Sequence, residues 1–186
     1  MSVLTAANVL TLLRLLLVPV FVICMLYGWP GWALIVFAVA GATDLFDGLI
    51  ARTTGHQTAL GAWLDPVADK VLLVTTFVML TIPGLGFANR LPLWLTVLVI
   101  SRDLGIILTV AIVNLAVARR TFKPTPLGKV ATGIFVLTGV VTLYANYLGE
   151  QLLLVRVCVY AALVVTLLSG AHYLMLMMRG EARAES

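Results

Sequence analysis

The chain has 186 residues, of which 62% are hydrophobic and 11% are charged, and its mean hydropathy is +1.11. A soluble domain carries about 25% charged residues, so this composition excludes an ordinary soluble globular protein and indicates an integral membrane protein. The formal net charge is +4, but the basic residues lie at the ends of apolar runs. This placement favours anionic lipid head groups over nucleic acid as partners.

Six apolar runs are each long enough to cross a bilayer, since a span needs about 20 mostly apolar residues. We predict spans at residues 9–27, 32–52, 61–82, 93–116, 127–148 and 152–178. Glycine and proline mark the connections between these runs, as is usual for turns. No connection is long enough to divide domains, so we expect one domain over residues 1–186, an all-α bundle of six transmembrane helices.

The basic residues predict the orientation of these spans, because cytoplasmic loops carry an excess of lysine and arginine. With the N-terminus inside, most basic residues fall in the cytoplasmic half, against Arg90 and Arg156 outside. Both termini are therefore expected in the cytoplasm, and the protein in a bacterial inner (cell) membrane. The aromatic residues expected at the outer ends of the spans are Trp29, Trp32, Trp94, Tyr144 and Tyr147.

Four carboxylates interrupt the second and third spans, where hydrocarbon would not tolerate idle charges. Intramembrane acids cost a few kcal/mol or more without a partner, a cavity or a metal, and are functional candidates by default. Asp44 and Asp47 lie three residues apart, and Asp65 and Asp69 lie four apart, so each pair shares one helix face. A short loop between two antiparallel helices would bring the pairs together near the cytoplasmic surface.

Charge repulsion within this acid cluster predicts a metal site. Four carboxylates close together would raise one another's pKa values. Hard divalent cations take oxygen ligands, and two of them would cancel the charge. A pair of metal ions is typical of phosphoryl chemistry, in which the ions stabilise the attacking and leaving oxygens.

A longer pattern surrounds the acids, D-x2-D-G-x2-A-R-x8-G-x3-D-x3-D, and it resembles the signature of the CDP-alcohol phosphatidyltransferases. The residues that fill it are Asp44, Asp47, Gly48, Ala51, Arg52, Gly61, Asp65 and Asp69. The chain length, the six-span layout and an N-terminal pattern are similar to that family too. The N-terminal pattern consists of Asn8, Thr11, Arg14 and Pro19.

The resemblance implies a reaction in which an acceptor hydroxyl attacks the phosphorus attached to diacylglycerol in CDP-diacylglycerol, and CMP leaves. The four aspartates would hold two divalent cations, Mg²⁺ or Mn²⁺, and Asp69 would also be the general base. The donor would be bound by Gly48, Arg52, Thr58, Gly61, Asn8 and Thr11. The family also suggests a homodimer among membrane lipids.

Basic residues outside the signature indicate an anionic acceptor, since arginine and lysine suit phosphate contacts. The candidates are Arg102, Arg119, Lys123 and Lys129. The segments ALGAWLDPVADKVL, SRD and KPT-x3-KV look most like the eukaryotic-type (CMP-forming) cardiolipin synthases, which use phosphatidylglycerol. The alternative is phosphatidylglycerophosphate synthase, which uses glycerol 3-phosphate.

Simpler interpretations stay open at several positions. Arg14 would only extend its charged end to the inner membrane surface, and Asn8 and Thr11 would only cap the first helix. The basic residues around Arg119 would only set the orientation of the protein in the membrane. Arg102 and Asp103 would form a structural ion pair, although adjacent helical residues do not face each other, so we expect separate partners. A cation or proton transporter is the alternative of another class, but its acids would line a path rather than gather at one surface.

Overall fold

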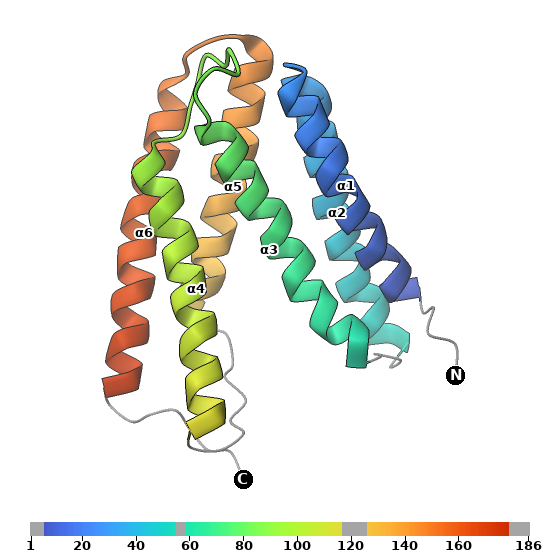
Figure 1. Ribbon diagram of the computed structural model, residues 1–186, viewed down its shortest axis with the longest axis vertical. Helices are drawn as coiled ribbons and strands as arrows, with labels where there is room; N and C mark the ends of the chain where they lie inside the picture. The colour runs from blue at the N-terminus through green and yellow to red at the C-terminus, as the bar shows by residue number, and fades with distance from the viewer. Residues whose placement is uncertain (1–5, 55–58, 117–125, 179–186) are drawn as a thin grey trace. The chain divides into compact units, whose positions relative to one another are not determined.

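The computed structural model describes residues 6–54, 59–116 and 126–178, and in these residues the regular structure is entirely helical (Figure 1). The helices are α1 (Ala6–Leu26), α2 (Pro30–Thr54), α3 (Ala59–Thr81), α4 (Leu93–Ala116), α5 (Pro126–Leu148) and α6 (Leu153–Met178). Every helix end lies within three residues of the end predicted from the apolar runs. The all-α class and the positions of these helices are therefore confirmed.

The apolar length of the helices differs along the described part of the chain. Two stretches are long and apolar enough to cross a membrane, Pro126–Leu148 and Leu153–Tyr173. Shorter apolar stretches occupy Thr11–Leu26, Pro30–Thr43 and Lys70–Thr81. Membrane crossing by all six helices stays a prediction, as does the orientation of the termini.

The chain forms two compact units, and each is described by itself. The first contains α1, α2, α3, the loop to Arg90 and the segment from Gly139 to Leu152, which includes the C-terminal part of α5. Within it α1 contacts both α2 and α3, and α2 contacts α3. The aromatic rings of Phe21 and Phe37 lie 6.3 Å apart between α1 and α2. A single domain over residues 1–186 stays a prediction.

Glycines in the left-handed region end α1 and α5 in the same way. Gly28 has φ of 70° and its N–H donates to Met25 O, while the N–H of Trp29 donates to Cys24 O. Gly149 has φ of 71° at the corresponding position after α5. This arrangement satisfies the last carbonyls of a helix, and only glycine adopts its backbone conformation without strain.

Two buried asparagines tie the loop before α4 to the end of α5 within the first unit. The N–H of Asn89 donates to Asn146 Oδ1 at 2.7 Å, and Asn146 Nδ2 donates to Asn89 O at 3.0 Å. Asn89 Nδ2 also donates to the carbonyl of Glu150 at 2.6 Å. We call these contacts the asparagine clasp. It supplies partners for backbone groups that burial would otherwise leave unsatisfied.

The second unit contains α4, the first part of α5 up to Thr138, and α6. α4 contacts α6, and Leu95, Val99 and Ala162 are buried in this unit. The Thr138 hydroxyl donates to Ile134 O in its own helix at 2.7 Å and lies 3.4 Å from Cys158 O of α6. In this unit, a buried hydroxyl is thus satisfied by a backbone carbonyl within an otherwise apolar packing.

Candidate functional site

The four signature aspartates lie on both sides of the connection between α2 and α3. Asp44 and Asp47 belong to the second half of α2, and Asp65 and Asp69 to the first half of α3. Both segments are helical, so spacings of three and four residues do place each pair on one face. The four side chains lie outside the described part of the structure, and their assignment as ligands stays a prediction.

The helix bounds place the two pairs at matching distances from that connection. Asp44 lies ten residues before the end of α2, and Asp69 lies ten residues after the start of α3. Asp47 lies seven residues before the same end and Asp65 six after the same start. Four residues separate the two helices, and the helices contact each other. At about 1.5 Å per residue, the acid-bearing segments therefore lie at similar levels on neighbouring helices.

The positions of the acids also follow the spacing of the buried residues in their helices. In α2, the buried residues Ala33, Phe37 and Ala40 are spaced by four and three, and further steps of four and three lead to Asp44 and Asp47. Such a spacing marks one face of a helix. By position along the helix, the first acid pair is therefore in register with the buried stripe of α2.

The stripe of α3 has the same form in the opposite chain direction. Leu72, Thr76 and Leu80 are buried at steps of four. Asp69 precedes Leu72 by three residues, and Asp65 precedes Asp69 by four. The spacing thus puts both acid pairs in register with residues that are buried further along their helices, as a shared polar site would require.

α1 carries two buried polar side chains in the same unit. Thr11 and Arg14 are each 1% exposed, and their spacing of three places them on one face. Burial contradicts the interpretation in which Arg14 only reaches the membrane surface. The burial of Thr11 is compatible with a donor contact, and that role stays a prediction.

The remaining donor candidates fall partly outside the described residues. Asn8 lies in α1, Gly48 and Arg52 in α2, and Gly61 in α3. Their surroundings lie outside the described part of the structure. Thr58 lies outside the described residues altogether.

The structure corrects one expectation for α4. Arg102 and Asp103 were expected to find separate partners, but Arg102 Nη1 lies 2.7 Å from Asp103 Oδ1. Arg102 Nη2 also donates to Ser169 Oγ of α6 at 2.6 Å. The expectation considered only the directions in which adjacent Cβ atoms point, whereas the long arginine side chain reaches round the helix to its neighbour. Nothing in the sequence indicates Ser169 as a partner.

The other acceptor candidates are less well placed. Lys129 lies in the first turn of α5 and is exposed. Arg119 and Lys123 lie outside the described residues. Both Arg102 and Lys129 belong to the second unit, and their role in acceptor binding stays a prediction.

Residues 4–169 match the model of the CDP-alcohol phosphatidyltransferase family. The chain belongs to the CDP-alcohol phosphatidyltransferase family. It is 40% identical over 177 residues to a probable phosphatidylglycerophosphate synthase of Mycobacterium tuberculosis, covering 90% of this chain and 78% of the relative. It is 39% identical over 140 residues to a CMP-forming cardiolipin synthase of Streptomyces coelicolor, covering 70% and 60%. The human CMP-forming cardiolipin synthase is 38% identical over 146 residues, covering 70% and 47%.

CDP-alcohol phosphatidyltransferases are membrane-associated enzymes that use divalent metal ions. The donor set of the signature fits such ions, because four carboxylates on two neighbouring helices supply the hard oxygen ligands that they prefer. Among the side chains that the structure describes, no three histidines, cysteines or acids gather in one place. The signature aspartates thus remain the candidate metal ligands.

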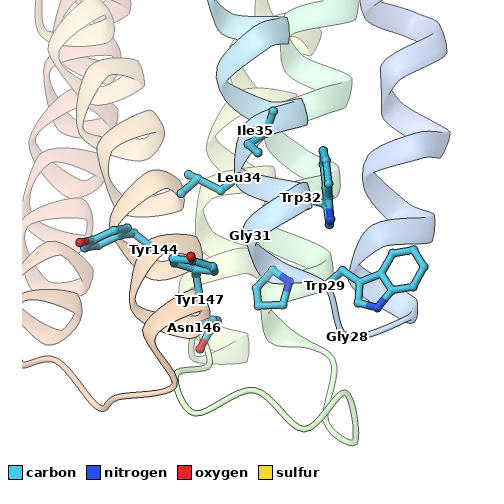
Figure 2. A pocket seen from close by; sticks show the side chains of 10 residues that line it. Gly28, Trp29, Gly31, Trp32, Leu34, Ile35, Tyr144, Asn146 and Tyr147 are labelled. Carbon is cyan, nitrogen blue, oxygen red and sulfur yellow. The ribbon is translucent and has the colours of Figure 1, made fainter.

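A separate cavity of about 740 Å³ lies at the other end of α2 within the first unit (Figure 2). Trp29 and Trp32 line it from the α1–α2 side, and Tyr144 and Tyr147 from α5. Their expected place at the outer ends of membrane spans stays a prediction. None of the residues that line the cavity is acidic or basic, so it offers no groups for phosphoryl transfer.

Proposed function

We propose that this protein transfers the phosphatidyl group of CDP-diacylglycerol to phosphatidylglycerol, which gives cardiolipin and CMP. The observation that carries the proposal is the complete family signature on two helical segments at matching levels of neighbouring helices. A common site is also supported by the spacing that puts both acid pairs in register with the buried residues of their helices. A transporter would need acids spread along a path through the membrane, and the two pairs occupy one level instead.

In the proposed reaction, Asp69 accepts the proton of the acceptor hydroxyl. The acceptor oxygen forms a bond to the phosphorus that carries diacylglycerol, and the bond from that phosphorus to the oxygen of CMP breaks. Two divalent cations, Mg²⁺ or Mn²⁺, bound by Asp44, Asp47, Asp65 and Asp69, would make the diphosphate more electrophilic and stabilise the departing phosphate. Gly48 and Gly61 would leave room for the cytidine diphosphate near the helix backbones, and Arg52, Thr58, Asn8 and Thr11 would contact it.

The proposed acceptor is anionic, and two candidates have specific support. Phosphatidylglycerol is favoured by the segments shared with cardiolipin synthases around Asp65, Arg102 and Lys129, and by the names of the Streptomyces and human relatives. Glycerol 3-phosphate is favoured by the Mycobacterium relative, whose match extends over 90% of this chain. Arg102, Arg119, Lys123 and Lys129 would bind the acceptor phosphate in either case.

The proposed setting is a bacterial inner membrane crossed by all six helices, with both termini and the acid cluster toward the cytoplasm. The helices contain 21 to 26 residues. At about 1.5 Å per residue they are long enough for a hydrocarbon core of about 30 Å. A homodimer is proposed from the family resemblance, and multi-angle light scattering of the purified protein tests it.

Product analysis with both acceptors in parallel tests the function. The purified protein in lipid nanodiscs receives CDP-diacylglycerol, Mn²⁺ and either phosphatidylglycerol or glycerol 3-phosphate, with EDTA and Asp69→Asn as matched controls. Cardiolipin and CMP from the first acceptor alone support the proposal. Phosphatidylglycerophosphate from the second alone overturns the first acceptor in favour of the second, and absence of CMP with both overturns the enzymatic function.

A further inference from the structure

Arg14 is a buried cation in a helix that is otherwise apolar around it, and the proposed reaction gives it no task. Its side chain is among the largest that are fully buried in the described residues. A charge taken out of water is costly unless an oppositely charged group or several hydrogen bonds compensate it. The guanidinium of Arg14 is therefore expected to have an anionic partner.

The helices that pack against α1 restrict the choice of that partner. α1 has no acidic residue of its own, and it contacts α2 and α3. The acids of α2 are Asp44 and Asp47, and those of α3 are Asp65 and Asp69. Any side-chain carboxylate that the neighbouring helices can offer to Arg14 thus belongs to the signature.

The register between α1 and α2 selects Asp44 among the four. The two helices are antiparallel neighbours joined by a short turn (Figure 1). The rings of Phe21 and Phe37 lie 6.3 Å apart between them. Arg14 lies seven residues before Phe21, and Asp44 lies seven residues after Phe37. Seven residues are about two helical turns, so both return to the face of the aromatic contact. Arg14 and Asp44 consequently lie at the same level.

The match extends beyond one pair of positions. On α1 the buried residues Met25, Phe21, Arg14 and Thr11 lie on one stripe. On α2, the corresponding positions counted from the turn are Ala33, Phe37, Asp44 and Asp47. The apolar residues of one stripe thus correspond in level to apolar positions of the other, and Arg14 and Thr11 correspond in level to the first acid pair.

We propose that Arg14 is the internal counter-charge of the acid cluster, which it compensates through Asp44 when no metal is bound. The inference rests on the proposed function in one respect, that the four aspartates bind divalent cations. Without metal, carboxylates at neighbouring levels repel one another, and a buried guanidinium relieves part of this repulsion. When cations bind, they supply the compensation themselves, so the fold depends on Arg14 mainly in the metal-free protein.

The test is thermal unfolding of the full-length protein in nanodiscs, with excess EDTA and with saturating Mn²⁺. Arg14→Met should lower Tm by about 10 °C in EDTA and by much less in Mn²⁺. Its Tm rise on adding Mn²⁺ is then larger than that of the wild type. Mn²⁺ titration followed by electron paramagnetic resonance should show binding about tenfold tighter to Arg14→Met, because a competing cation has been removed.

Three further variants define the role of the charge. Arg14→Lys keeps the charge and should restore most of the Tm in EDTA. Arg14→Met combined with Asp44→Asn removes both partners and should lose less stability in EDTA than Arg14→Met alone. Arg156→Met removes an exposed cation of α6 and should leave Tm and the Mn²⁺ response unchanged.

The outcomes separate this inference from the proposed function. A wild-type protein that neither binds Mn²⁺ nor gains Tm from it would overturn the metal site, and with it the proposed mechanism. If Mn²⁺ raises the Tm of the wild type but Arg14→Met lowers Tm equally in EDTA and in Mn²⁺, Arg14 contributes only packing. That result overturns the inference and leaves the proposed function standing. If Arg14→Met responds to Mn²⁺ as the wild type does but has a raised KM for the donor, Arg14 binds the donor instead, and the inference is overturned. If Arg14→Met does not fold, Arg14→Lys decides the question. An Arg14→Lys protein that also fails to fold overturns the role of Arg14 as counter-charge.

Discussion

Removal of the Asn146 side chain should destabilise the first unit by a predictable amount, because the contacts of the asparagine clasp are known. The side chain accepts a hydrogen bond from Asn89 N–H at 2.7 Å and donates one to Asn89 O at 3.0 Å. Asn89 is 8% exposed, so neither backbone group has free access to water. Each buried group left unsatisfied costs about 1–3 kcal/mol, and Asn146→Ala should therefore cost about 3 kcal/mol.

The assay is reversible unfolding in mixed detergent micelles by titration with sodium dodecyl sulfate. Asn146→Asp is the comparison variant: its carboxylate still accepts from Asn89 N–H, but it places a buried negative charge against Asn89 O, so it should cost at least as much stability as Asn146→Ala. Gln151→Ala removes an exposed amide nearby and should stay within about 0.5 kcal/mol of the wild type. An Asn146→Ala protein as stable as Gln151→Ala would refute the reasoning, as would an Asn146→Asp protein as stable as the wild type.

Three other predictions concern the acids, the ion pair and the cavity. Asp69→Asn should lower turnover by at least about a hundredfold with donor binding retained, because a general base contributes that much, and near-normal turnover would reject its role. Asp103→Asn should cost about 3–5 kcal/mol in the same unfolding assay, because it leaves the charge of Arg102 buried without its carboxylate; a loss below about 1 kcal/mol would contradict this. Gly31→Ala would bring a Cβ within 2.6 Å of the Tyr147 ring, so its cost should largely disappear in a Tyr147→Ala background; additive losses would show that the cost does not come from this contact.

The helices were predictable because their signals are local. Apolar runs of sufficient length, bounded by residues such as Gly28, Pro30 and Gly149, placed every helix end to within three residues. The candidate site was predictable for the same reason, since its eight signature residues lie close together in the chain. Its side-chain geometry lies outside the described residues, and the metal ligands stay predictions.

The contacts that sequence reasoning missed join residues far apart in the chain or depend on side-chain length. Asn89 and Asn146 are separated by 57 positions, and neither has a neighbour in the sequence that indicates the clasp. Arg102 reached its own neighbour because the arginine side chain is long and flexible. The partner of Arg14, by contrast, has a sequence signal in the mirrored spacing of residues about the turn at Gly28. That signal acquires meaning only once the contact between Phe21 and Phe37 fixes the register.

The helical hairpin of α1 and α2 has an apolar part at the Phe21–Phe37 contact and a charged part at the Arg14–Asp44 level. Two helical turns separate these levels. The border lies within about 10 Å along the helix axis, about a third of the hydrocarbon thickness of a bilayer. An amphiphile with a diphosphate head and two acyl tails has the same division along its own length. Such a molecule can lie parallel to the hairpin. Its acyl tails then stay in the lipid beside the apolar part, and its diphosphate head lies beside the charged part.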